Sequence, residues 1–372
     1  MKVKIINSLQ ELRDIRSDWN KLVACALEQN INYEPTPLVS LLDNLDYPGW
    51  FVITIWSDDE LCGFFPMQKR KHKSLPIERI TPLFENHISI CVPLVDKDLL
   101  LSILNEYWRW FNEEGKSRIL HIPELLPSSE VFQSFLSTAK EHSITLDLAS
   151  RSKRAIGNTN GDDYDAYFQK TLSAKSRGAY RRKKRNIEKY VGNWRTEIID
   201  GPDERLDTFI DHLIKIEGSG WKFRNGSAIQ QQPGVQAFIS EFMHWAAVKN
   251  RLVLAISFAG DRAVSAISGF VCDGTLFIYK IGFDESLKKY SVGESTMMDV
   301  VKYAHSDKRI EWIDSVAHQN MQMWNRGLSD RQSVLSYKLA SNNIMAKAAT
   351  IGISKSRRIR NRIKHFYLKS RA

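Results

Sequence analysis

The second half of the chain has the pattern of a β-meander followed by a helix and another strand. Strand-like apolar runs are separated by short turns, and Asp273-Gly274 is a dipeptide typical of a two-residue hairpin. Apolar residues at helical spacing then follow a loop that contains Ser and Gly. The expected elements are strands 251–258, 263–272 and 275–283, a helix from 292 to about 305, and a strand at 310–316.

The first half repeats this order at weak sequence similarity. Its expected elements are a helix at 8–28, strands 49–56, 61–68 and 87–93, a helix at 97–113, a strand at 117–122, a helix at 129–142 and a strand near 143–149. Residues 155–163, rich in Gly, Asn and Asp, are the expected linker, and a helix is expected over 164–192. We therefore predict a tandem duplication of one α+β unit, in which each half has a mixed, mostly antiparallel sheet flanked by helices.

A length of 372 residues suits two domains. The pattern places an N-terminal domain at 1–158, a C-terminal domain at 159–345 and a basic tail at 346–372.

The net charge of +10 comes from two short segments. Residues 173–190 carry a net charge of +7 and residues 354–372 one of +8, which leaves −5 for the rest of the chain. Because the body is acidic, the charge favours contact with phosphate groups or a membrane surface over binding of a nucleic-acid duplex. In the tail, apolar residues recur at helical spacing among Lys and Arg: Ile359, Ile363 and Phe366. This pattern is typical of an amphipathic helix on an anionic membrane. A helix that binds a partner protein, or one that folds back on the body, fits equally well.

The four cysteines are far apart, and none has the CxxC or Cys/His spacing of a metal site. We expect core thiols, and neither a disulfide framework nor a bound metal. No apolar run approaches the ~18 residues of a transmembrane helix, and the N-terminus lacks a signal-peptide apolar region. These features predict a cytoplasmic protein, with contact to the inner face of the membrane left open.

Glu217 is the first candidate for a functional carboxylate. It continues the apolar stripe of Leu206, Ile210 and Leu213 on an expected helix at 203–217, and Lys222 follows it after a Gly-containing turn. A buried carboxylate is costly unless a cation pairs with it. Two interpretations stay open. Glu217 is either structural, paired with Lys222 or exposed at a frayed helix end, or it is an acid/base or substrate-anchoring group beside an accessible backbone.

The loop at 288–295, KKYSVGES, stands between a strand and a helix. The N-terminus of a helix offers unpaired N–H groups to a phosphate. A Ser that only caps the helix would give the same pattern.

Asp314 and His318 follow the last expected strand, where catalytic side chains are often found, although a single His at a strand end is more often an ordinary polar residue. The sequence contains no GxSxG, Walker A or GxGxxG motif, which argues against a serine hydrolase and against ATP or dinucleotide binding.

Several segments together resemble a known family. They are NINYEPTPLVSLLDNL (30–45), CGFFPMQ (62–68), NHISICVPLVD (86–96), RGAYRRKKRNIEK (177–189), IEGSGWKFRNGSAI (216–229), YKIGFDESLKKYSVGESTMMDVVKYA (279–304) and IDSVAHQNMQMWNRGLSDRQSV (313–334). The chain resembles the GNAT acyltransferase fold, duplicated as in FemAB-like proteins. More closely, it is similar to the CelD/BcsL group of acetyltransferases of cellulose and exopolysaccharide biosynthesis. The resemblance runs from about residue 7 to 340, and GSGWK and SVGES are its most specific segments.

This resemblance implies an N-acyltransferase that takes its acyl group from acetyl-CoA or another acyl-CoA, without a metal, by direct attack of an amine on the thioester. The donor pyrophosphate would lie on the loop formed by Tyr290, Ser291, Val292, Gly293, Glu294 and Ser295. The pantetheine arm would separate strands 275–283 and 310–316 and pair with freed backbone at Tyr279 and Ile281. The usual phosphate loop of the fold is richer in Arg and Gly than SVGES.

The other site residues are assigned roles in this acyl transfer. The candidates for catalysis are Glu217, Lys222, Asp314 and His318, and those for acceptor binding are Trp221 and Arg181. The C-terminal domain would be catalytic, and the N-terminal domain would shape an acceptor cleft. The expected acceptor is a small-molecule or lipid-linked amino sugar. The alternatives are an aminoacyl-tRNA-dependent transferase of the FemAB-like type, an RNA-binding protein, and a scaffold that binds no donor.

Overall fold

The computed structural model describes residues 1–71, 77–84, 87–113, 116–161 and 163–350, so the predicted tail helix lies outside the described residues. The chain separates into two compact units. Among the described residues, the first unit contains those of Met1–Pro35, Tyr47–Ser152 and Ser333 to Thr350, and the second contains those of Thr36–Asp46 and Lys153–Gln332.

The first unit is built on a mixed sheet with strand order β1-β2-β3-β4-β6-β13, and β5 pairs with β3. Its described neighbouring strands β1–β2, β2–β3, β3–β4, β3–β5 and β6–β13 are antiparallel, whereas β4 and β6 are parallel. Its helices bury aromatic side chains, among them Tyr107 and Trp108, in the core. The elements are β1 (Lys2–Ile6), α1 (Leu9–Asp14), α2 (Arg16–Cys25), η1 (Ile31–Tyr33), β2 (Trp50–Ser57), β3 (Glu60–Lys71), β4 (Glu78–Pro82), β5 (Leu94–Val95), α4 (Leu100–Phe111), β6 (Arg118–Leu125), α5 (Glu130–Glu141) and most of β7 (Thr145–Asn158) and β13 (Asp330–Ala340).

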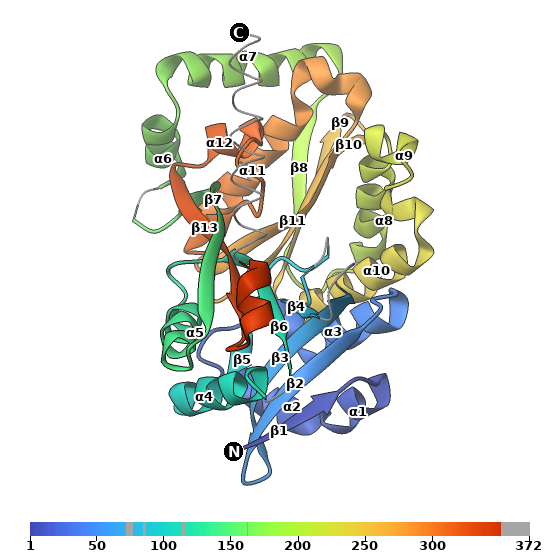
Figure 1. The fold of residues 1–372 in the computed structure, drawn as a ribbon. Helices are drawn as coiled ribbons and strands as arrows, with labels where there is room; N and C mark the ends of the chain where they lie inside the picture. The colour runs from blue at the N-terminus through green and yellow to red at the C-terminus, as the bar shows by residue number, and fades with distance from the viewer. Residues whose placement is uncertain (72–76, 85–86, 114–115, 162, 351–372) are drawn as a thin grey trace. The chain divides into compact units, whose positions relative to one another are not determined.

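The second unit has the sheet order β7-β12-β11-β10-β9-β8, in which β11 and β12 are parallel. Helices α8 and α10 cover one face of this sheet, and α11 with α6 covers the other (Figure 1). The elements are α3 (Pro35–Asn44), α6 (Tyr164–Thr171), α7 (Ala174–Tyr190), β8 (Trp194–Ile199), α8 (Leu206–Glu217), α9 (Trp221–Arg224), η2 (Ile229–Gln231), α10 (Pro233–Val248), β9 (Leu252–Ala259), β10 (Arg262–Cys272), β11 (Thr275–Phe283), η3 (Glu285–Tyr290), α11 (Val292–Ser306), β12 (Trp312–Asp314) and α12 (Gln322–Gly327).

The predicted duplication is confirmed by the topology. In the first unit, the antiparallel strands β2, β3 and β4 precede α4, after which β6 pairs with β4 in parallel. In the second unit, β9, β10 and β11 precede α11, after which β12 pairs with β11 in parallel. Both halves therefore follow the order of meander, helix and parallel strand, and the fold is α+β.

Three sequence expectations are wrong. Residues 87–93 form no strand, because the side chains of Asn30 and Asn32 take the place of a neighbouring strand. Asn30 donates to the carbonyls of Ile90 and Val92 at 3.1 and 2.7 Å, and Asn32 accepts from the N–H groups of Ser89 and Ile90 at 3.1 and 3.2 Å.

The second correction concerns the expected linker at 155–163. Its first half belongs to β7, whose residues Ile156 to Asn158 pair with β12. The predicted helix at 164–192 is also divided, because Ser173 begins a new helix by accepting a hydrogen bond from the N–H of Ser176.

Candidate functional site

The parallel ladder between β11 and β12 is short. Thr275–Phe277 pair with Trp312–Asp314, and β11 then continues through Phe283 while β12 ends. Residues 278–283 thus extend past the end of the β12 ladder, and on their other edge they remain paired with β10. Strands 275–283 and 310–316 are therefore paired over three residues each, and their separation around a donor stays a prediction.

A β-bulge lies on β11 next to the end of the ladder. Lys280 pairs with Ser268 and Ile278 pairs with Gly269, so Tyr279 is the extra residue. The Tyr279 ring packs against Phe242 of α10, with centroids 5.8 Å apart. The bulge places Tyr279 and the following Lys280 on the face of the sheet that α8 and α10 cover.

The C-terminal end of α8 packs directly on β11. A Cβ atom at Gly282 would lie 2.8 Å from both the Cα and the N of Glu217, so only glycine permits this approach. The contact places Glu217 beside the extended part of β11, and its position on the buried stripe of α8 is the one that the periodicity predicts.

Glu217 is buried, at 7% exposure, and both of its carboxylate oxygens are engaged. The Lys222 ammonium donates to Oε1 at 2.7 Å, and the N–H of Ile229 donates to Oε2 at 3.0 Å. The Lys222 Nζ also lies 3.4 Å from the carbonyl oxygen of Ile281 on β11. The Glu217–Lys222 ion pair considered in the sequence is therefore formed, and it is tied to the strand next to the bulge.

Lys280 is the residue in this cluster that the sequence did not single out. Burial, with a smaller effect from the Lys222 charge, lowers the pKa of Lys280 to about 8, although Glu217 opposes the shift. Its Nζ lies 4.5 Å from the centroid of the Tyr279 ring. A Lys in an apolar strand has no sequence signal that marks it as functional, because it is usually an outward-facing solvent contact.

The start of α11 follows β11 through η3. Ser291 lies in the left-handed region, with φ of 57°, and its side chain makes no capping hydrogen bond. Val292 and Ser295 are buried, whereas the Gly293 backbone has room beside it, since a Cβ there would be 3.5 Å from Phe283. The first turn of α11 therefore has backbone N–H groups that no side-chain cap satisfies, which are suited to an anion.

Two cations meet at this end of α11. Lys183 of α7 lies 2.6 Å from Glu294, and Arg326 of α12 lies 3.3 Å from the same carboxylate. Further along, Lys184 lies 3.5 Å from Asp299. Part of the basic run on α7 is therefore directed toward α11. No local sequence pattern predicts these pairings, because their partners are remote in sequence.

The contacts of Asp314 and His318 are with residues other than Glu217. Asp314 is buried, pairs with Arg154 at 2.6 Å and accepts from the N–H of Val316 at 2.8 Å. His318 is exposed, and its Nδ1 accepts from the N–H of Asn320 at 3.3 Å. Val316 has a φ of 47°, a strained backbone for a β-branched residue, directly after β12.

The two predicted acceptor residues are exposed. Trp221 begins α9 with 54% of its surface accessible, and its N–H donates to Glu285 at 3.0 Å. Arg181 projects from α7. The structure thus groups Glu217, Lys222 and Trp221 near the end of β11, and leaves Arg181 on the surface of another helix.

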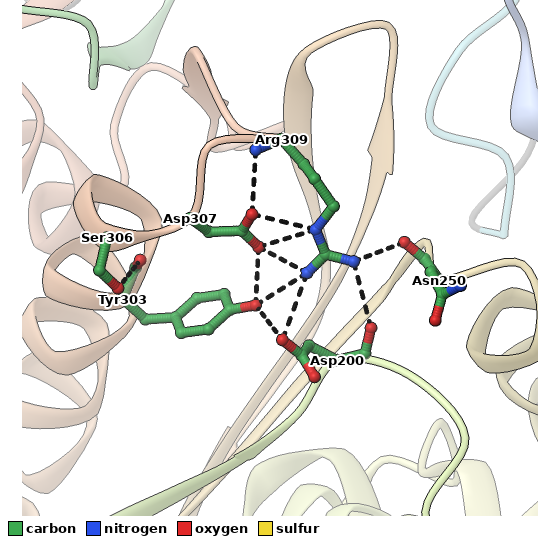
Figure 2. Close-up of polar contacts among 6 residues, drawn as sticks. All are labelled: Asp200, Asn250, Tyr303, Ser306, Asp307 and Arg309. Carbon is green, nitrogen blue, oxygen red and sulfur yellow. Dashed lines mark hydrogen bonds and ion pairs between the residues drawn. The ribbon is translucent and has the colours of Figure 1, made fainter.

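A second polar cluster anchors the chain between α11 and β12 (Figure 2). Arg309 binds Asp307 at 3.0 Å through Nε, and it donates to the carbonyl oxygens of Asp200 and Asn250 at 3.3 and 2.7 Å. The Tyr303 hydroxyl lies 2.7 Å from carboxylate oxygens of both Asp200 and Asp307. Burial by itself raises the pKa of Asp307. The hydrogen bonds that Arg309 donates to its carboxylate help to lower it, and the pKa lies below its usual range. This network ties the segment before β12 to the ends of β8 and β9, and it therefore positions the short ladder.

A cavity of about 570 Å³ lies beside this network, on the α11 face of the sheet. It is lined by side chains of α6, α7, β8 and α11, including Tyr164, Trp194, Asp299 and Tyr303. Within the described ranges, no group of three or more His, Cys, Asp and Glu side chains could hold a metal ion. No helix among the described residues is long and apolar enough to cross a membrane.

Residues 174–321 match the model of the GNAT acetyltransferase domain. No curated protein matches the sequence. The fold is similar to that of solved structures at low sequence identity, which shows the fold alone. A conserved protein of unknown function from Bacteroides thetaiotaomicron has a TM-score of 0.52 at 14% identity, with 88% of this chain and 97% of that chain covered.

Two other solved structures are equally similar. FemX has a TM-score of 0.52 at 9% identity, with 91% of this chain and 97% of that chain covered. A domain described as the C-terminal part of a lysylphosphatidylglycerol synthetase from Agrobacterium fabrum has a TM-score of 0.51 at 10% identity, with 92% and 95% covered. The chain thus has the GNAT fold, and with the domain match it is an N-acyltransferase.

Proposed function

We propose that the protein transfers an acyl group from acyl-CoA to the amine of an amino sugar, by direct attack on the thioester. The short ladder of β11 and β12, with the start of α11 beyond it, is the observation that carries this proposal. Acyl-CoA would supply the thioester carbonyl and a pyrophosphate. The extended part of β11, including Tyr279 and Ile281, would contact the pantetheine arm.

The charges at the start of α11 are complementary to those of the donor phosphates. An anion near Tyr290, Ser291 and Gly293 would meet the N–H groups of the first helical turn and the cations Lys183 and Arg326. Glu294 shares those cations and would compete with the phosphate. Val292 would contribute through its backbone, because its side chain is buried. Ser295 would only line the turn, because its side chain is buried and its N–H already donates to the carbonyl of Ser291 at 3.2 Å.

The acceptor side of the proposal rests on the α8 end of the site. Glu217 and Lys222 would position the acceptor or handle protons, and Trp221 offers an exposed aromatic face to a sugar ring. Asp314 and His318 remain rival candidates for the base, and Arg181 a candidate for acceptor binding. A small-molecule or lipid-linked amino sugar of surface-polysaccharide synthesis, as in the CelD/BcsL group, is the acceptor that we propose.

Calorimetry with acetyl-CoA and with free CoA tests the donor. We expect saturable binding of both, with Lys183→Met weakening it several-fold because an ammonium at the phosphate site is lost. Lys175→Met is the matched control, since Lys175 is an exposed lysine near the start of the same helix. Release of free thiol in the presence of a panel of amino sugars then identifies the acceptor. Absence of any binding by CoA derivatives would overturn the proposal.

A second candidate function is transfer from aminoacyl-tRNA. One observation favours it: exposed cations of α7 stand beside a Tyr190–Tyr290 stack with centroids 6.3 Å apart, a combination suited to a nucleic-acid strand. Titration with tRNA over a salt series separates the two functions. A steep loss of tRNA affinity with salt, together with no binding of acetyl-CoA, would support this alternative.

A further inference from the structure

The carboxylates that could serve as a general base in this site are already engaged. Glu217 accepts from the Lys222 ammonium and from the N–H of Ile229, and Asp314 pairs with Arg154 at 2.6 Å. A carboxylate whose oxygens already hold hydrogen-bond donors must give up one of these contacts before it can take a proton from an acceptor amine. The proton released by the attacking amine therefore needs another acceptor.

Lys280 lies where such an acceptor is needed. It is on β11 beyond the last residue paired with β12, and the bulge at Tyr279 directs it to the α8 face, among Glu217 and Lys222. Bulges of this kind re-aim side chains beside active sites. The charges of the Glu217 carboxylate of α8 and of the Lys222 ammonium after α8 act on it, and its Nζ lies 4.5 Å from the centroid of the Tyr279 ring.

We propose that the Lys280 amine, and not a carboxylate, accepts the proton that the acceptor ammonium loses in acyl transfer; this inference rests on the function proposed above. The acceptor ammonium gives one proton to neutral Lys280, and the resulting amine attacks the thioester carbonyl. The new N–C bond forms as the C–S bond breaks. The second proton moves from the nitrogen to the departing thiolate, and the Lys280 ammonium returns its proton to water.

The electrostatics of the cluster suit this cycle. Burial and the neighbouring Lys222 charge bring the pKa of Lys280 to about 8, so a large fraction is neutral at mildly alkaline pH. The Glu217 carboxylate then stabilises the ammonium after proton transfer. A lysine in water, with a pKa near 10.4, would be almost fully charged at the same pH.

The first experiment measures the pH at which the Lys280 amine loses its proton, in the absence of an acyl donor and of an acyl acceptor. Trace labelling of lysines with acetic anhydride over a pH series, followed by mass spectrometry, gives the pH at which each amine becomes reactive. We expect Lys280 to reach half-maximal reactivity near pH 8, well below the pH at which the exposed surface lysines as a group become reactive, because a lysine in water has a pKa near 10.4. Titration of Lys280 together with these surface lysines would overturn the proposal, whatever the donor is.

The second experiment measures turnover. Lys280→Arg keeps a cation that cannot lose its proton, and Lys280→Met removes the amine. We expect both to lower kcat about 10²- to 10⁴-fold without loss of folding by circular dichroism. Lys249→Met, at an exposed lysine directly after α10, is the control that retains activity.

Chemical rescue separates catalysis from a structural role. In Lys280→Ala, added small amines should restore turnover, with rates that rise with the basicity of the amine. Full activity of Lys280→Arg, or absence of rescue in a folded Lys280→Ala variant, would exclude Lys280 as the proton acceptor. If the wild type itself turns over no acyl-CoA, the proposed function fails instead, while the labelling result still stands by itself.

Discussion

Glu217 and Lys222 form a pair whose geometry determines what each residue contributes. The carboxylate is buried and takes two hydrogen bonds, whereas the ammonium keeps about a quarter of its side chain exposed, at 26%. Removal of one member of a buried pair leaves the other without compensation for its lost solvation. The pair is thus a structural clamp on the α8 end, and it also sets the charge around Lys280.

Glu217→Gln should lower the free energy of unfolding by about 1–3 kcal/mol, because the amide retains the shape but loses the charge that Lys222 needs. Urea denaturation measures the change. Glu204→Gln, at an exposed position before α8, is the control for loss of one negative charge. Equal stability of both variants would contradict the clamp. In the same variant, the labelling midpoint of Lys280 should move to lower pH, since Glu217 raises its pKa.

The low pKa of Lys280 has a consequence for stability. Below pH 8 the amine is charged in both the folded and the unfolded chain, and the fold carries the whole cost of burying that charge. Between about pH 8 and 10 the unfolded chain binds more protons than the folded one, so stability rises with pH. The difference in unfolding free energy between wild type and Lys280→Met should therefore shift in favour of wild type over this window. A difference that stays constant with pH would contradict the lowered pKa of Lys280.

Sequence reasoning about single residues succeeds where partners are close in sequence. Glu217 ends α8 and Lys222 follows five residues later, so the two partners are close in sequence. The apolar stripe of α8 correctly predicts that the Glu217 carboxylate is buried. Asp314 was identified, but its partner Arg154 is remote in sequence and no local pattern joins them. The position of Lys280 does not follow from the sequence, because the bulge at Tyr279 shifts the alternation of side chains between the two faces of β11. The bulge depends on how β11 pairs with β10 and not on residue type.

At the scale of elements, the contact of α8 with β11 depends on one glycine. Gly282→Ala would place a methyl group 2.8 Å from backbone atoms of Glu217, which cannot rotate away as a side chain can. We expect a loss of about 1–3 kcal/mol of stability, measured by thermal or urea unfolding, as α8 is pushed off the strand. A stable variant with unchanged Lys280 reactivity would show that α8 has freedom to move.

Gly293 provides the contrasting case at the start of α11. A Cβ there meets Phe283 at an ordinary 3.5 Å, and the helical backbone accepts alanine. Gly293→Ala should leave stability unchanged or raise it by up to about 1 kcal/mol. Its affinity for acetyl-CoA should fall about tenfold, which corresponds to about 1.4 kcal/mol, because the methyl group stands where a phosphate would approach. Calorimetry beside a melting curve tests both parts, and unchanged affinity would remove the phosphates from this turn.

Most elements follow from periodicity and hairpin turns, and the exceptions have physical causes. The region at 87–93 has the composition of a strand, yet the amides of Asn30 and Asn32 satisfy its backbone. Residues 156–158 look like a linker, yet they gain a partner in β12. The strands β1, β4, β8 and β13 were not predicted, because each depends on partners that are distant in sequence.

At the scale of the whole molecule, the charge divides into parts with different surroundings. On α7, Lys183 and Lys184 are directed to acidic residues of α11, whereas Arg181, Arg182 and Arg185 are exposed. The exposed set leaves this helix cationic after its internal pairings are made. A donor with several phosphates at the start of α11 would contact the paired lysines. A larger polyanion, such as a nucleic acid, would also need the exposed arginines of α7.

The segment at 354–372 carries the other half of the excess charge, with a net charge of +8. If it attaches the enzyme to a membrane, the full chain should sediment with vesicles that contain phosphatidylglycerol and remain in solution with vesicles of phosphatidylcholine alone. Each basic residue near an anionic surface contributes up to about 1 kcal/mol, so a chain that ends at Thr350 should bind at least about tenfold more weakly. High salt should release the full chain as well. Equal sedimentation of both chains would assign membrane contact elsewhere, and thiol release with a water-soluble amino sugar should be the same for both.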